Sequence, residues 1–244
     1  ALLSANAQKR AFTIEDLYRV KGVSSVSLSP DGKTVCYTAS SSDLKSQKSG
    51  SDIYIMNADG SHTKALTEDG KSSSAVWSKD GKSIFFTNNE KGTAQIFRMD
   101  LTTCETEQVT DYELGIGSPV ISPDERYIAF TAEVYPDLGA DAKANKARME
   151  KKEQGPVQAH IADKLLYRHW TSYNDGRCNH LILFDTQTKT YKDLTPGNYS
   201  LIFVVGGGIT YQFSPDSKEI CFVSNHDEHQ EASTNADLWT VSVN

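Results

Sequence analysis

The chain has 244 residues, 38% of them hydrophobic, which is enough to build one large core or two small ones. Its formal net charge of -7 would repel a phosphate backbone, so we expect no nucleic acid among its partners. No apolar run approaches the roughly 18 residues that cross a bilayer, and the composition predicts a soluble globular protein.

The first residues allow two interpretations. Residues 1–7, ALLSANA, carry small side chains at Ala5 and Ala7, as at the end of a secretory signal peptide, and they also fit a disordered tail. The first interpretation implies a periplasmic or secreted protein. Thr13 then precedes Asp16 by three residues, a spacing typical of a capping box, and it predicts a short helix ahead of the first strand.

A ten-residue stretch occurs four times, as SPDGKTVCYT from Ser29, SKDGKSIFFT from Ser78, SPDERYIAFT from Ser122 and SPDSKEICFV from Ser214. Proline presets φ, aspartate bonds its own backbone and glycine accepts a positive φ, so the start of the stretch favours a tight turn. Apolar residues alternate with others after the turn, which is the pattern of a β-strand. Each copy therefore predicts a strand, a turn and a second strand.

A seventeen-residue stretch follows three of the copies and predicts another hairpin: SDIYIMNADGSHTKALT from Ser51, AQIFRMDLTTCETEQVT from Ala94 and NHLILFDTQTKTYKDLT from Asn179. The two stretches together give four antiparallel strands in about 45 residues, the size of a β-propeller blade. The sequence thus predicts an all-β fold, a partial β-propeller of about four four-stranded blades over residues 8–244. We expect the blades at 22–67, 72–110, 116–195 and 203–244, with the last incomplete, so that the chain is a fragment of a larger ring.

The third blade carries extra residues, expected at 134–162. The stretch DLGADAKANKARMEKKEQGP is rich in Ala, Lys and Glu, and it predicts a surface helix bounded by Gly139 and Gly155. Insertions in repeat arrays usually emerge on one rim, which is often where ligands bind. A solvated helix without a binding role is the alternative.

The chain lacks a complete catalytic motif. The pentapeptide G-x-S-x-G, which places a serine nucleophile on a sharp turn, does not occur, so we expect no catalytic residue and no hydrolysis by this chain alone. Four cysteines without CxxC pairing are expected to be small buried apolar side chains: Cys36, Cys104, Cys178 and Cys221. The stretch HDEHQE from His226 has metal-binding residue types but lies in a polar loop, so we expect no metal and no cofactor.

One stretch departs from ordinary blade composition, because Tyr167, Arg168 and Trp170 stand together beside the insertion and ahead of an Asn-Asp-Gly turn. Arginine and aromatic side chains suit a substrate-facing rim, where they hold carbonyls, carboxylates or rings. A buried tryptophan with an arginine stacked on it is the structural alternative.

Several stretches resemble the amino-terminal propeller of the prolyl oligopeptidase family of serine peptidases, in its dipeptidyl-peptidase V and acylaminoacyl peptidase branch. These are the blade repeats, the entry helix FTIEDLYRV, the insertion after IAFTAEVYPD and, above all, DKLLYRHWTSYNDGRCNHLILFD. The blade repeats are weakly specific, since periplasmic propellers of the Tol-Pal type share them. The last stretch is much more specific.

The resemblance implies a propeller that caps an α/β-hydrolase domain with a Ser-Asp-His triad, gates its site and admits short peptides. Exopeptidase members use propeller carboxylates to hold the free amino terminus, and Glu133 is our candidate for such an acid. The implied partners are therefore the hydrolase domain of the parent chain and oligopeptide substrates. A non-enzymatic Tol-Pal type binding propeller is the alternative, and open blade edges would let copies of the chain self-associate.

Overall fold

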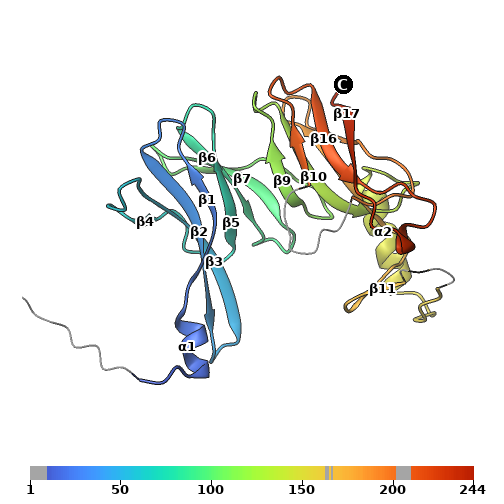
Figure 1. The fold of residues 1–244 in the computed structure, drawn as a ribbon, viewed down its shortest axis with the longest axis horizontal. Coiled ribbons are helices and arrows are strands. Elements are labelled where there is room, and N and C mark those ends of the chain that lie inside the picture. The colour runs from blue at the N-terminus through green and yellow to red at the C-terminus, as the bar shows by residue number, and fades with distance from the viewer. Residues whose placement is uncertain (1–9, 163–164, 166, 202–209) are drawn as a thin grey trace, which may run out of the picture. The chain divides into compact units, whose positions relative to one another are not determined.

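The computed structural model describes residues 10–162, 165, 167–201 and 210–244, so the expected tail at 1–7 lies outside the described residues (Figure 1). The predicted all-β fold is confirmed, with antiparallel sheets of four strands. The chain divides into two compact units, one running up to Asn88 with Asp100–Cys104 added, the other formed by Asn89–Met99 and Glu105–Asn244.

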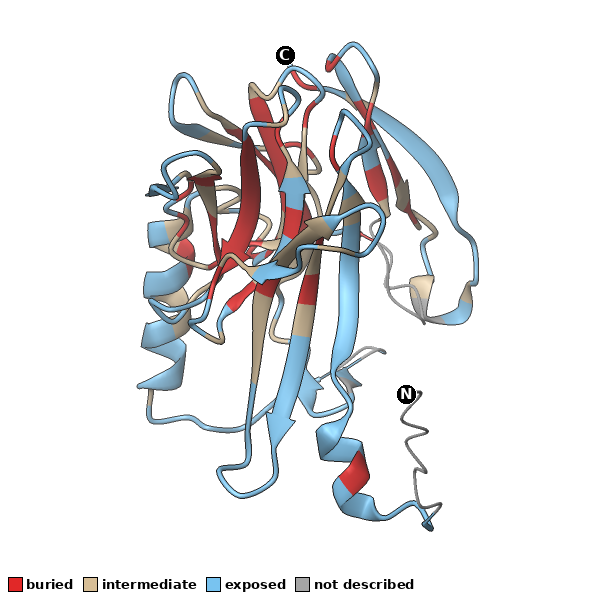
Figure 2. Cartoon of the chain, turned by 90° about the vertical axis from the view of Figure 1, so that its left-hand side faces the viewer, coloured by how far each residue is buried: buried red, intermediate tan, exposed pale blue. Residues whose placement is uncertain are grey.

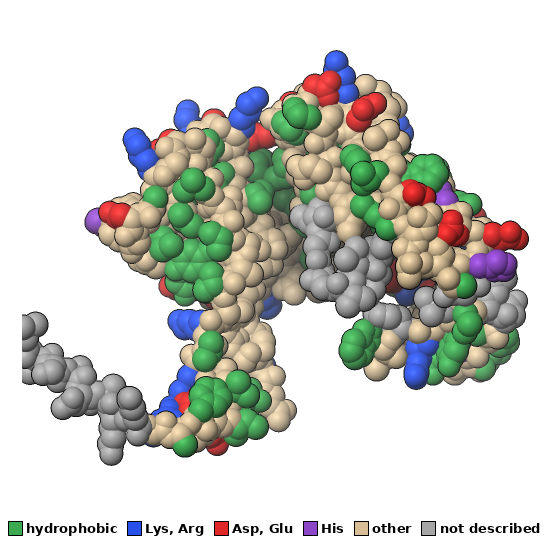
Figure 3. All heavy atoms as spheres, viewed as in Figure 1, with side chains coloured by type: hydrophobic (Ala, Val, Ile, Leu, Met, Phe, Trp, Pro, Cys, Tyr) green, Lys and Arg blue, Asp and Glu red, His purple; other side chains and the backbone are tan. Residues whose placement is uncertain are grey.

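The first unit begins with helix α1 (Ile14–Arg19). Its start follows the predicted capping pattern, because the backbone N–H of Thr13 donates to the Asp16 carboxylate at 2.9 Å. Hydrophobic side chains gather on the surface of this helical segment in Figure 3, where Phe12, Ile14 and Leu17 are exposed. The first four-stranded sheet follows, in the order β1 (Gly22–Leu28), β2 (Thr34–Asp43), β3 (Lys48–Asn57) and β4 (Lys64–Ala65).

The second sheet comprises β5 (Ser72–Trp77), β6 (Ser83–Asn88), β7 (Gln95–Asp100) and β8 (Thr106–Gln108). Strands β5 and β6 pair within the first unit, and β7 pairs with β8. In the first unit, β5 contacts β1, β2 and β3, so the first sheet presents one face to it. The buried side chains of that unit include Cys36, Ile53, Ala75 and Ile84.

The third sheet lies in the second unit and has the order β14 (Thr190–Asp193), β13 (Cys178–Asp185), β10 (Tyr127–Val134) and β9 (Gly117–Ile121). The chain leaves the sheet after β10 and returns at β13, and it forms helix α2 (Ala142–Glu153) and the hairpin of β11 (Arg168–His169) and β12 (Ser172–Tyr173) between them. The excursion is longer than the predicted insertion at 134–162, because the short hairpin also lies outside the blade. The predicted helix is present within its expected bounds.

The fourth sheet contains β15 (Tyr211–Phe213), β16 (Glu219–Ser224) and β17 (Asp237–Ser242), with a short helix η1 (Gln230–Ala232) before the last strand. It packs on the third sheet through one hydrophobic cluster, to which both sheets contribute: Tyr127, Ala129, Leu181, Leu183, Tyr211, Phe213, Ile220 and Phe222. Figure 2 shows the buried residues concentrated in the sheets, whereas the helices are mostly exposed.

The repeated ten-residue stretch folds the same way in all four copies. The serine hydroxyl donates to the aspartate two residues later, at 2.6 to 2.7 Å: Ser29 to Asp31, Ser78 to Asp80, Ser122 to Asp124 and Ser214 to Asp216. The residue after the aspartate has a positive φ in every copy and is glycine in only two, namely Gly32, Gly81, Glu125 and Ser217. The recurring sequence is therefore a recurring hydrogen-bonded turn.

The expectation that all four cysteines are buried is wrong. Cys36 is buried, Cys178 is half-buried, and Cys104 and Cys221 are exposed, all with free thiols. Cys36 and Cys221 occupy the same column of the repeat, so sequence alone does not separate them. The two cysteines differ in what covers them. Cys36 faces strand β5, and its thiol lies 3.6 Å from the Ala75 carbonyl. Cys221 lies on the face of the fourth sheet that is opposite the buried cluster.

Candidate functional site

Helix α2 is fixed to the third blade by Asn145, whose side chain is fully buried. Its side-chain oxygen accepts the backbone N–H of Tyr135 at 2.6 Å, and its amide nitrogen donates to the carbonyls of Gly139 and Asp141 at 3.0 and 2.8 Å. The helix begins at the Asp141 cap, whose carboxylate accepts the N–H of Ala144 at 2.9 Å. The three bonds of Asn145 therefore tie the first turn of α2 to the end of β10.

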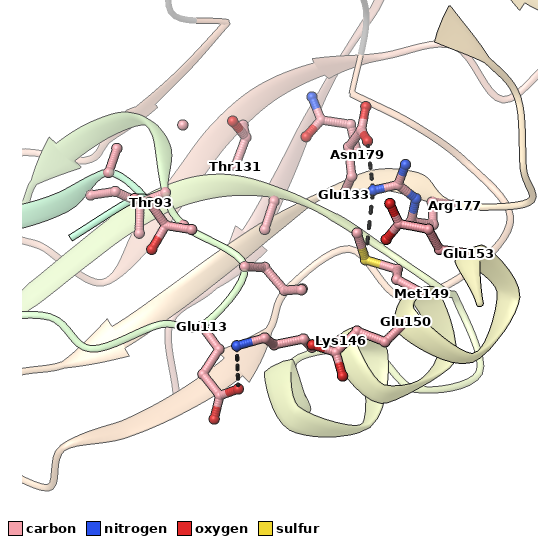
Figure 4. Close-up of a pocket in the computed structure, with 17 residues that line it drawn as sticks. Thr93, Glu113, Thr131, Glu133, Lys146, Met149, Glu150, Glu153, Arg177 and Asn179 are labelled. Carbon is pink, nitrogen blue, oxygen red and sulfur yellow. Dashed lines mark hydrogen bonds and ion pairs between the residues drawn. The ribbon is translucent and has the colours of Figure 1, made fainter. Parts of the chain in front are cut away.

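A cavity of about 610 Å³ lies within the second unit, between α2, β10, the start of β13 and the segments flanking β7 and β9 (Figure 4). Polar and charged side chains account for most of the labelled lining: Thr93, Glu113, Thr131, Glu133, Lys146, Glu150, Glu153, Arg177 and Asn179. Met149, Leu114, Ile116 and Ala94 add apolar surface. The volume lies within the range of small-ligand sites, and the many charged groups of the lining favour a polar ligand.

The lining carries an excess of negative charge, since four glutamates face two cations. Lys146 pairs with Glu113 at 3.5 Å and Arg177 with Glu133 at 3.1 Å. Glu150 and Glu153 belong to none of the ion pairs found among the described residues. The site therefore favours a ligand with a positive charge.

Glu133, the acid singled out in the sequence, lies in this lining and is 64% exposed. It stands one residue before the end of β10, opposite Asn179 of β13 in the strand register. Arg177 precedes β13 and is only 23% exposed. Its Nε donates to both oxygens of Asp175, at 2.9 and 3.0 Å, while Nη1 reaches Oε2 of Glu133.

The pKa values of Asp175 and Arg177 depend on the charges around them. Burial alone would raise the pKa of Asp175, but its bonds with Arg177 outweigh burial and lower that pKa. Burial would likewise lower the pKa of Arg177, and the neighbouring carboxylates of Asp175 and Glu133 raise it instead. Asp175 and Arg177 are therefore held ionised as a pair at neutral pH.

The structure places the other three residues singled out in the sequence on the hairpin β11–β12 and beside it, and none of them lines this cavity. Trp170 occupies the hairpin turn with φ +47° and is 83% exposed, so the alternative of a buried tryptophan is wrong. Tyr167 is exposed at 47%. Arg168 lies over the ring of Tyr173, 6.0 Å from its centroid, and the same ring stacks on His160 at 4.0 Å.

Sequence reasoning missed Asp175, Arg177 and the acidic face of α2. The signal for α2 was present, because Lys146, Met149, Glu150 and Glu153 have the spacing of one helix face. Arg177 could have been found by extending the third seventeen-residue repeat backwards to its strand start. Its partner Glu133 comes from another strand, which no local pattern connects to it.

Within the described ranges, no three histidine, cysteine or acidic side chains come together as a metal site. The same residues contain no helix long and apolar enough to span a membrane.

Comparisons with known proteins agree with this architecture. Residues 11–154, more than half of the chain, match the family described as TolB beta propeller domain. Dipeptidyl-peptidase 5 of Porphyromonas gingivalis is 31% identical over 228 residues, which cover 91% of this chain and 32% of that protein. The peptidase YuxL of Bacillus subtilis is 25% identical over 236 residues, covering 96% of this chain and 34% of that protein. The chain spans about a third of the length of these curated relatives.

Two solved structures show the same fold at low identity. The acylaminoacyl peptidase of Pyrococcus horikoshii matches with a TM-score of 0.64 and 18% identity, over 92% of this chain and 31% of that one. The β-propeller domain of the Trilobed protease from Pyrococcus furiosus matches with a TM-score of 0.51 and 17% identity, over 91% and 55%. The predicted resemblance to peptidase propellers agrees with the similarity to Dipeptidyl-peptidase 5, and the chain belongs to the TolB beta propeller domain family.

Proposed function

We propose that the chain is part of the propeller of a secreted or periplasmic serine exopeptidase, and that it gates and lines the peptide site. The catalytic serine would belong to an α/β-hydrolase domain of the same polypeptide, outside these 244 residues. Dipeptidyl-peptidase 5 of P. gingivalis, at 31% identity over 91% of the chain, supports a peptidase of this branch. Its name suggests that the substrates are oligopeptides cleaved near the amino terminus.

Two sheets carry exposed hydrophobic side chains among the residues that the structure describes, and these support a longer propeller. On β1, Val23, Val26 and Leu28 are more than half exposed. Cys221 on β16 and Leu238 on β17 are exposed, although Cys36, the equivalent of Cys221 in the first copy of the repeat, is buried. Further blades of the same polypeptide would cover such faces, as blades do in a closed ring. Self-association of copies through these faces is the competing arrangement, and it would appear as a dimer of the full-length protein in light scattering.

The observation that carries the proposal is the acidic cavity containing Glu133. A peptide's free amino terminus is largely protonated at neutral pH, since its pKa is about 7.7 to 8.0. A carboxylate beside it contributes favourable Coulomb energy that an acylated amino terminus does not receive. The cavity therefore favours release of dipeptides from unblocked peptides over removal of acylated residues.

The experiment compares Glu133→Gln with the parent sequence in the full-length protein. Its substrates are a dipeptidyl p-nitroanilide with a free amino terminus and the same compound N-acetylated. Loss of a partly exposed ion pair, worth up to about 1 kcal/mol, should raise KM for the free-amino substrate about fivefold. The kcat for that substrate and both constants for the acetylated compound should stay within about twofold.

An equal effect on both substrates would contradict recognition of the amino terminus by Glu133. Absence of turnover of either substrate by the full-length parent protein would favour the non-enzymatic binding propeller instead. Tyr167, Arg168 and Trp170 remain a prediction as substrate contacts. The three side chains are exposed on the hairpin and beside it, which supports a second binding surface that approaches substrate from outside the cavity.

A further inference from the structure

We propose that Asp175 is a positioning residue, which holds Arg177 and through it sets the orientation and the available charge of the Glu133 carboxylate in the cavity. This inference rests on the proposed function of that cavity. Asp175 does not itself line the cavity, so its effect on a ligand must pass through Arg177.

The contact is bifurcated, because a single N–H of the Arg177 side chain is shared by both carboxylate oxygens of Asp175. Asp175 accepts the Arg177 side chain through two bonds to Nε and also accepts the Arg177 backbone N–H at 3.3 Å. Its own position is fixed by the Asn-Asp-Gly turn, where Asn174 accepts the N–H of Gly176 at 2.9 Å and Gly176 has φ +92°. A guanidinium anchored at Nε by a charge-assisted contact loses part of its rotational freedom, which restricts the direction in which its Nη donors point.

That direction is toward Glu133. Nη1 of Arg177 lies 3.1 Å from Oε2 of Glu133 and 3.8 Å from the Met149 sulfur. Oε1 of Glu133 has no hydrogen bond among the described residues, which leaves it for a ligand. Arg177 therefore fixes one oxygen of Glu133 and leaves the other in the cavity.

The charge of Asp175 is a second reason why this residue should affect ligand binding. Arg177 alone would neutralise Glu133 and repel a ligand's ammonium group. Asp175 restores one net negative charge to the group formed by Glu133, Arg177 and Asp175. The side chains of Asp175 and Arg177 are only 20% and 23% exposed, so solvent screens their charges less. Removing the Asp175 charge thus both frees Arg177 to move and cancels the attraction that Glu133 offers.

The chain offers a matched control on the same insertion. Arg148 donates to both oxygens of Asp137, at 2.8 and 2.6 Å, and neither residue lines the cavity. Asp137→Asn therefore removes a second arginine–aspartate pair, made through Nη1 and Nη2 of Arg148, by changing a residue that does not line the cavity. It reports any general loosening of the insertion.

The experiment measures KM and kcat of the full-length protein for the free-amino dipeptidyl p-nitroanilide. Asp175→Asn should raise KM about fivefold with kcat within about twofold. Arg177→Lys should do the same, because an ammonium group does not reproduce the separate Nε and Nη1 contacts of Arg177 with the two carboxylates. Asp137→Asn should leave both constants unchanged. In a Glu133→Gln background, Asp175→Asn should cause no further rise in KM, since its effect passes through Glu133.

The outcomes separate the two proposals. If Glu133→Gln raises KM and Asp175→Asn does not, or if the two effects multiply in the double variant, the positioning role is overturned while the proposed function stands. If Arg177→Lys matches the parent protein, the guanidinium contacts of Arg177 are not required and the inference also fails. If Glu133→Gln itself leaves KM unchanged, the proposed function of the cavity fails first.

Discussion

His180 on β13 should make the stability of the second unit depend on pH in an unusual direction. The ring is fully buried, with Nδ1 2.7 Å from the Asp193 carboxylate and Nε2 2.9 Å from the Gly197 carbonyl. Both partners only accept hydrogen bonds, so both ring nitrogens must carry a proton. Burial alone would lower the pKa of His180, but Asp193 and its other partners outweigh it and raise the pKa to about 9.

The magnitude follows from linkage. A pKa raised from its ordinary value of 6.5 to about 9 corresponds to about 3 kcal/mol of folding free energy. That stability is fully present below pH 6.5, where the unfolded chain also binds the proton, and it is lost as pH rises through 9. The free energy of unfolding should thus fall by about 2 to 3 kcal/mol between pH 6 and pH 9.

Asp193→Asn supplies the reference, because it keeps an oxygen for the N–H of Thr195 and removes the charge. Urea unfolding of both proteins, followed by far-ultraviolet circular dichroism at pH 6, 7.5 and 9, gives the difference in unfolding free energy. We expect a difference of about 3 kcal/mol at pH 6 and below about 1 kcal/mol at pH 9. A difference that is independent of pH, or that grows toward pH 9, would refute the argument for a buried imidazolium.

Two further predictions concern the turns and the insertion. Gly32→Ala should lower the free energy of unfolding by about 1 kcal/mol through backbone strain alone, because Gly32 has φ +72° and open space around a Cβ. Cys104→Gly should raise the free energy of unfolding by about 0.5 kcal/mol, because Cys104 is an exposed turn residue with φ +60°. Thermal unfolding measures both, and equal signs for the two changes would contradict the strain argument. Asn145→Ala should cost about 1 to 3 kcal/mol and speed amide exchange in α2, because it removes the partner of the Tyr135 N–H and the side-chain donor to the Gly139 carbonyl. Unchanged exchange in α2 would show that the helix is held by other contacts.

The blades were predictable from the sequence because their determinants are local. Each Ser-x-Asp turn closes within six residues, since the serine hydroxyl also accepts a backbone N–H five residues later, as from Thr34 at 2.9 Å and Tyr127 at 2.9 Å. The insertion helix was predictable for the same reason, from composition between two glycines. Local information of this kind repeats with the blade, so four copies reinforce one interpretation.

The site was only partly predictable, because its residues are brought together by strand register. Glu133 and Asn179 face each other across β10 and β13, although 45 residues separate them in the chain. The polar residue in the second position of each seventeen-residue stretch is another case in which sequence alone does not predict the contacts. Asp52 accepts the Thr67 hydroxyl and His180 binds Asp193, roles that the residue types alone do not distinguish from surface positions.

The most direct measurement combines product analysis with labelling of the nucleophile in the full-length protein. The protein is incubated with an unblocked oligopeptide, and separately with a fluorophosphonate that modifies activated serines, and both reactions are read by mass spectrometry. The account predicts dipeptides released from the amino terminus and a label on a serine within G-x-S-x-G outside these 244 residues. A label on a serine of this chain, or binding of the peptide without any cleavage, would contradict it.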